Sequence, residues 1–146
     1  MGQFEKWVGT WEGSGWQMAG ETKQEFKAVE TIRRHSGGSV YSIEAKHWFE
    51  EEGKPNRMIF DIIGLFTFDR NTGKRFLTMY MPNGAAPSYE ISMKENGFSW
   101  NVGGGGAGSI DMSLEFNGNQ WLEKGFVKSE DARVQIFEMN MTRKQN

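Results

Sequence analysis

The sequence predicts an all-β protein: a single antiparallel up-and-down β-barrel of about ten strands, with a short helical turn at the N-terminus. Apolar and polar residues alternate with a period of two along most of the chain, which is typical of half-buried antiparallel strands. Tight-turn pairs such as Asn83-Gly84 and Asn96-Gly97 interrupt this alternation at short intervals. After the first turn, no segment has the pattern of a crossover helix.

The elements follow from these signals in order along the chain. Residues 2–7 have the pattern of a helical turn, and ten strands come after it. Their predicted ranges are 8–17, 22–35, 39–50, 56–68, 74–81, 87–94, 97–102, 108–117, 119–128 and 132–143. A two-sheet sandwich is the competing architecture. Even hairpin spacing favours the barrel, because closure removes the exposed strand edges.

Length and composition narrow the class of protein. The 146 residues fit one domain, 1–146, and the net charge of −2 gives no basic stripe for nucleic acid. The chain has no cysteine and no apolar run of about 18 residues, so we expect no thiolate chemistry and no membrane span. We expect a cytoplasmic protein with no nucleic-acid or membrane partner. A homodimer is the macromolecular assembly that the sequence leaves open.

Large apolar side chains are unusually frequent, with 6 Trp, 11 Phe and 9 Met. Such side chains fill cores and also line pockets for flat apolar ligands. Alternation places several of them on one strand face, together with a histidine as a polar anchor. The predicted ligand-binding residues are Tyr41, His47, Phe60, Tyr80, Tyr89, Trp100 and Met112. The leading hypothesis is therefore a non-enzymatic barrel that binds a small apolar or aromatic ligand, without catalytic residues, a metal site or a cofactor.

Alternative interpretations exist for several of these residues. A lone histidine such as His47 is more often a hydrogen-bonded structural residue than a ligand or base. Glu30 and Glu123 lie in strands with apolar residues on both faces, so alternation does not decide whether they point inward. A cofactor-free enzyme using His47 with such a carboxylate is a less favoured hypothesis. Residues 103–108 contain G-x-G-x-x-G, but a strand pattern follows, so we expect a hairpin loop and no nucleotide site.

Residues 4–15 (FEKWVGTWEGSG) resemble the first strand of lipocalin-like (calycin) barrels, and two later segments, 64–74 (GLFTFDRNTGK) and 137–143 (FEMNMTR), resemble an uncharacterised bacterial group of such proteins. The first is similar to the opening strand of nitrobindin-like proteins and of an uncharacterised bacterial group of similar size. The resemblance implies that Trp11 plugs the bottom of the barrel and that Arg143 packs across it. Their cation–π contact is expected to contribute about 0.5–2 kcal/mol.

The same resemblance raises haem as a cofactor. Nitrobindin-like haem proteins ligate iron through a histidine in the C-terminal part of the barrel, and this chain has no histidine after His47. The family's ligand position is therefore unmatched. Haem binding is kept as an alternative function to be tested at His47.

Overall fold

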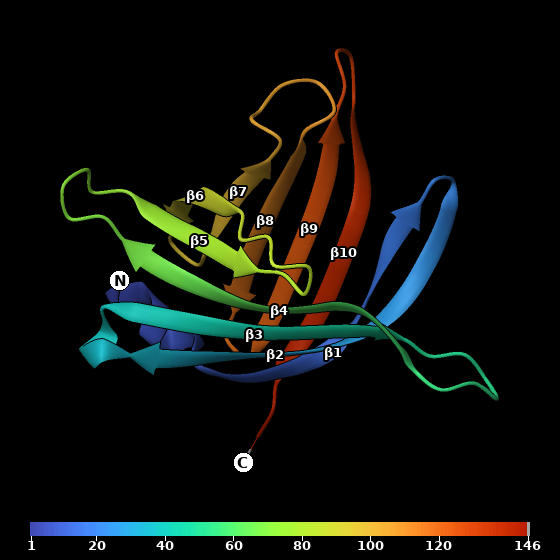
Figure 1. Cartoon of the computed structure of the whole chain (residues 1–146), viewed down its shortest axis with the longest axis horizontal. Coiled ribbons are helices and arrows are strands. Elements are labelled where there is room, and N and C mark those ends of the chain that lie inside the picture. Colours follow the sequence, from blue (N-terminus) through green and yellow to red (C-terminus); the bar gives the residue numbers. More distant parts are fainter. Residues whose placement is uncertain (146) are drawn as a thin grey trace.

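The computed structural model describes residues 1–145, which form ten antiparallel strands closed into one barrel (Figure 1). The predicted all-β barrel with an N-terminal helical turn is confirmed. The strand order around the barrel is β1-β10-β9-β8-β7-β6-β5-β4-β3-β2. The elements are η1 (Gly2–Trp7), β1 (Gly9–Ala19), β2 (Thr22–His35), η2 (Ser36–Gly38), β3 (Val40–Phe49), β4 (Arg57–Phe68), β5 (Arg75–Tyr80), β6 (Ser88–Lys94), β7 (Gly97–Val102), β8 (Ile110–Asn117), β9 (Gln120–Lys128) and β10 (Arg133–Arg143).

Pairing of the first strand with the last closes the barrel. β1 and β10 run antiparallel in a register that places Trp11 opposite Arg143. The two strands approach unusually closely, because a Cβ on Gly13 would lie 2.0 Å from the carbonyl oxygen of Asn140. A Cβ on Gly15 would lie 2.3 Å from the carbonyl oxygen of Glu138. These glycines therefore permit the tight coiling of β1 over β10.

One end of the barrel is plugged by η1, which lies beside the η2 turn in Figure 1. The ring of Phe4 is fully buried and lies 4.6 Å from Phe66, centroid to centroid. Trp7 stacks on Phe116 at 4.5 Å, and Trp11 lies 5.2 Å from the same ring. The plug is therefore made mainly by the N-terminal helix, and Trp11 forms its inner layer.

Arg143 fastens this plug to the last strand. Its guanidinium lies 4.4 Å from the ring of Trp11. It donates hydrogen bonds to the backbone carbonyl of Lys6 at 2.6 Å, to that of Val8, and from Nε to Asn119 Oδ1 at 3.1 Å. We refer to this group of contacts as the Arg143 clasp.

The opposite end carries the hairpin loops 20–21, 50–56, 81–87, 103–109 and 129–132, several of which project to the right and top of Figure 1. The predicted loop at 103–108 is one of them. Its backbone needs glycine, because Gly103, Gly104 and Gly105 have φ angles of 107°, 87° and 89°. Among the described residues, no helix is long and apolar enough to cross a membrane.

Candidate functional site

The interior of the barrel holds a cavity of about 280 Å³ between the plug and the loop end. Its wall is mainly apolar and comes from β3, β4, β5, β7, β8 and β10, with side chains such as Ile62, Met79 and Phe137. Four of the lining residues are polar, namely Gln17, Glu30, His47 and Glu123. A surface groove of about 490 Å³ beside β6–β8 is larger, but charged and polar residues border it.

His47 and Glu30 form a buried pair on neighbouring strands. His47 Nε2 lies 2.7 Å from Glu30 Oε2, and each side chain is 6% exposed. A carboxylate can only accept a hydrogen bond, so Nε2 of a neutral imidazole carries the proton and Nδ1 keeps its lone pair. Nδ1 makes no hydrogen bond with any described residue. The pair therefore presents an imidazole that is oriented by a carboxylate.

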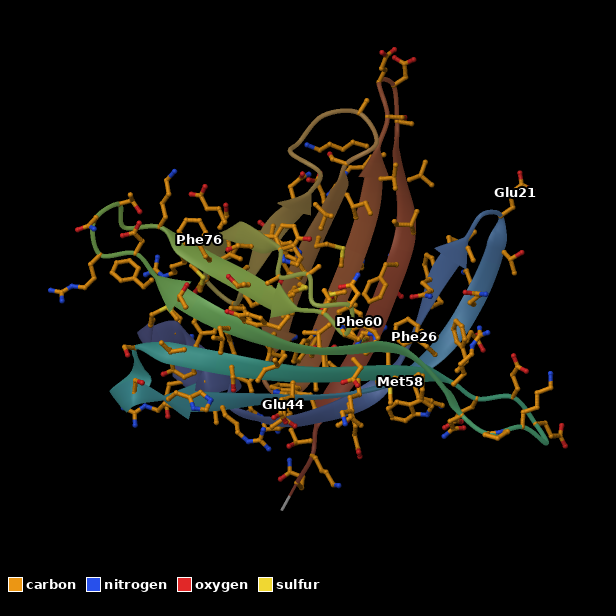
Figure 2. All side chains as sticks on the ribbon, in the orientation of Figure 1. Glu21, Phe26, Glu44, Met58, Phe60 and Phe76 are labelled. Atoms are coloured by element: carbon orange, nitrogen blue, oxygen red, sulfur yellow. The ribbon has the colours of Figure 1, made fainter. Side chains whose placement is uncertain are left out.

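Two phenyl rings hold the imidazole in place. Phe26 stacks on it with centroids 4.9 Å apart and planes 11° apart, and Phe60 lies 4.9 Å away on a tilted plane. Figure 2 labels both phenylalanines, on β2 and β4, where they lie close together. The β3–β4 register shifts between His47 and Trp48, immediately after the histidine. Bulges of this kind bend a strand and redirect its side chains, often next to functional sites.

Glu123 is the second carboxyl of the cavity. Trp121 Nε1 donates a hydrogen bond to Glu123 Oε1 at 3.2 Å. Burial raises the pKa of Glu123 well above its usual range, and the nearby charge of Glu30 raises that pKa further. The Trp121 hydrogen bond opposes these effects and lowers the pKa. Two carboxyls with different surroundings can serve as one proton donor and one charged acceptor.

Four of the seven predicted ligand-binding residues line this cavity. They are His47, Phe60, Trp100 and Met112. These four side chains therefore face the interior of the barrel, and ligand binding by them stays a prediction.

Three predicted residues lie elsewhere. Tyr41 packs into the plug, 5.5 Å from the ring of Phe4, and its hydroxyl donates to Glu5 Oε2 at 2.8 Å. Tyr80 is 46% exposed, because the inward positions of β5 are Leu77 and Met79. Tyr89 is half-buried and packs against the core without lining the cavity. None of these three tyrosines lines the cavity, and their prediction as ligand-binding residues of the cavity is corrected accordingly.

Alternation did not assign Glu30, Glu123 and Gln17 to the cavity. Glu30 follows Phe26 and Ala28 at even spacing, and all three are buried. That alternation was the available signal, but apolar Val29 lies between them on the opposite face. Glu123 has Leu122 as a neighbour, so the same ambiguity arises. Only the closed barrel shows that the two carboxyls and His47 share one space.

The residues of this cavity do not fit a haem. His47 Nε2 is already bonded to Glu30, and the rings of Phe26 and Phe60 pack against the imidazole. The cavity of about 280 Å³ is also smaller than typical ligand pockets, which span about 300–1,000 Å³. Within residues 1–145, no cluster of three His, Asp or Glu side chains is arranged to hold a metal ion.

The fold and cavity define a class, a closed antiparallel barrel with a small, mainly apolar interior that contains acid and base groups. No protein-family model and no curated protein sequence matches the chain. Among solved structures, it is similar to Rv2717c from M. tuberculosis, with a TM-score of 0.69. The alignment covers 99% of each chain at 12% sequence identity, a likeness that shows the fold alone.

Proposed function

We propose that this protein binds a small, largely apolar ligand inside the barrel, with one polar group of the ligand directed at Glu30, His47 and Glu123. The observation that carries the proposal is the composition of the cavity wall. It is mostly apolar, and its polar residues include a buried histidine–glutamate pair and a buried carboxyl. Apolar pockets with a few placed polar groups are typical of ligand sites.

The size and polarity of the cavity indicate the class of ligand. About 280 Å³ suits a molecule with one ring or a short chain better than a fatty acid or a porphyrin. Burial of apolar surface contributes about 25 cal/mol per Å² to its affinity. A carbonyl or hydroxyl oxygen on the ligand gives the protonated Glu123 an acceptor. The preferred ligand is therefore a monocyclic ketone or phenol.

Relationship to lipocalin-like barrels is part of this proposal. The Gly-x-Trp opening of β1 and the Arg143 clasp support it, since the sequence resemblance implies the same Trp11–Arg143 contact. We further propose that the protein works in the cytoplasm as a binding protein for such compounds.

Intrinsic tryptophan fluorescence tests the proposal, because Trp100 lines the cavity. Acetophenone, p-cresol and cyclohexanone are titrated into the protein, and thermal denaturation is followed in parallel. We expect a saturable change in emission that is lost in Trp100→Phe, together with a rise in Tm. Ligand binding to the folded state alone raises stability by RT ln(1 + [L]/Kd), about 2.7 kcal/mol at 100 times Kd.

A matched pair of variants locates the site. Val102→Phe fills part of the cavity, whereas Val134→Phe makes the same change at a side chain that is 56% exposed. We expect Val102→Phe to abolish the Tm rise and Val134→Phe to retain it. Equal responses in both variants, or no response in the wild type, would overturn the proposal.

A further inference from the structure

We infer that the cavity is a proton-transfer site, which moves a carbon–carbon double bond of a small β,γ-unsaturated ketone into conjugation with its carbonyl. This inference rests on the proposed function, since the ketone must first bind inside the barrel. It adds a reaction to that binding. No cofactor is needed, because substrate and product are isomers.

The base is His47 Nδ1. Its Nε2–H is held by Glu30 at 2.7 Å, and the phenyl rings of Phe26 and Phe60 fix the plane of the ring. Arg75 Nε is the only buried side-chain nitrogen or oxygen without a partner among the described residues. The unbonded Nδ1 therefore keeps accessible surface. His47 is buried and lines the cavity, so in this scheme that surface meets the bound ligand.

The hydrogen-bond donor is Glu123. Oε1 accepts a bond from Trp121, and Oε2 makes no hydrogen bond with a described residue. Burial beside Glu30 favours the neutral acid, because two ionised carboxyls in one apolar cavity repel each other. A neutral carboxylic acid donates a hydrogen bond to a carbonyl oxygen, and it donates more strongly as that oxygen gains charge.

The reaction then balances with these groups alone. Nδ1 of His47 takes a proton from the carbon between the carbonyl and the double bond. The electron pair of the broken C–H bond moves toward oxygen and gives a dienolate, which Glu123 stabilises by its hydrogen bond. The imidazolium, stabilised by the Glu30 carboxylate, returns the proton to the γ-carbon. The double bond is then conjugated, and both side chains are in their starting states.

Glu30 is a positioning residue in this scheme, because it acts through the imidazole. The titratable residues that line the cavity with His47 are Glu30 from β2 and Glu123 from β9. The nearest parts of β4 and β10 contribute Phe60 and Phe137, which do not titrate. Replacement of Glu30 by glutamine removes the charge that stabilises the imidazolium. It should therefore lower kcat and shift the pH profile of kcat/KM toward lower pH.

Cyclohex-3-en-1-one is the test substrate, since its conjugated product, cyclohex-2-en-1-one, absorbs ultraviolet light that the substrate does not. We expect saturable isomerisation by the purified full chain. His47→Gln and Glu123→Leu should each lower kcat/KM by about 100-fold or more, the scale of acid–base catalysis. Glu123→Gln retains an N–H donor and should lose less than Glu123→Leu. Val134→Phe should leave the rate unchanged.

The result separates this inference from the proposed function. Saturable binding of cyclohexanone without isomerisation above the buffer rate overturns the inference and leaves the binding function intact. Absence of both binding and turnover overturns both. If the His47→Gln variant has the circular dichroism spectrum of the wild type and still isomerises the substrate at the wild-type rate, the proton-transfer inference is also overturned. An unchanged pH profile in Glu30→Gln, with a changed KM, would remove the positioning role assigned to Glu30.

Discussion

Replacing Arg143 by methionine tests whether the Arg143 clasp contributes to the free energy of unfolding or only covers the plugged end of the barrel. Methionine keeps much of the apolar stem and removes the charge and the donors. The lost contacts are the cation–π contact with Trp11 at 4.4 Å and hydrogen bonds to Lys6, Val8 and Asn119. These contacts join the two ends of the chain, since Lys6 and Arg143 are 137 residues apart.

The expected cost follows from these contacts. A cation–π contact contributes about 0.5–2 kcal/mol, and a hydrogen bond from a charged donor about 1.5–3 kcal/mol when it is buried. The hydrogen bonds here are exposed or partly buried, so water replaces much of what is lost. We expect Arg143→Met to lower the free energy of unfolding by about 2–4 kcal/mol.

Urea denaturation followed by tryptophan fluorescence measures this change, with the m-value expected to stay constant. The matched control is Arg133→Met. Arg133 lies 4.3 Å from the ring of Phe126, but it is exposed and lies beside the hairpin loop 129–132. We expect Arg133→Met to lower the free energy of unfolding by about 0.5 kcal/mol or less. Equal losses in the two variants, or an Arg143→Met loss below about 0.5 kcal/mol, would refute the role assigned to the clasp.

Three further predictions concern the plug, the closing strands and the buried acid. Phe4→Ala should lower the free energy of unfolding, measured by urea titration, by about 3–5 kcal/mol, because loss of the fully buried ring leaves a cavity in the plug. A loss below about 1 kcal/mol would contradict the role of Phe4 in the plug. Gly13→Ala should strongly destabilise the folded protein, because the new Cβ meets the Asn140 carbonyl. Gly106→Ala is the control and should be near neutral, because no atom lies within 4 Å of its new Cβ. Similar melting curves for the two variants would contradict the close crossing of β1 over β10. The pKa of Glu123 is raised in the folded state, so as pH rises above 4.5, the ordinary pKa of the carboxyl, the unfolded chain loses this proton first. The contribution of Glu123 to the free energy of unfolding should therefore fall as pH rises above 4.5, by at most about 1.4 kcal/mol per pH unit. In Glu123→Gln this pH-dependent contribution should vanish. If the free energy of unfolding of Glu123→Gln depended on pH in the same way as that of the wild type, the raised pKa would be disproved.

Much of the fold was predictable from local chemistry. Turn pairs and period-two alternation each report on a few adjacent residues, and the observed strand ends agree with the predicted ones to within two residues. Barrel closure was also predictable, because ten hairpin-linked strands leave two edges that pair with each other.

The site was predictable only in part. His47 and Trp100 lie in strands whose outward residues are polar, so their inward orientation is visible in the sequence. Glu30 lies beside apolar Val29, and the sequence alone does not tell which of the two points inward. Tyr41 alternates correctly with the core, but η1 fills its end of the barrel, and alternation cannot report which part of an interior is occupied. The position of an inward side chain along the barrel axis, in the plug or in the cavity, depends on contacts between segments that are distant in the sequence.

The β1–β10 pairing has a consequence for how the chain reaches this structure. Every other strand pair joins sequence neighbours and can form as a local hairpin, whereas this pair brings together nearly the whole length of the chain. Closing so long a loop is entropically costly, so we expect closure to limit the folding rate. During synthesis, β1 leaves the ribosome first and must wait for β10. Until then its unpaired edge is open to other strands, and the protein is most prone to aggregation in that interval.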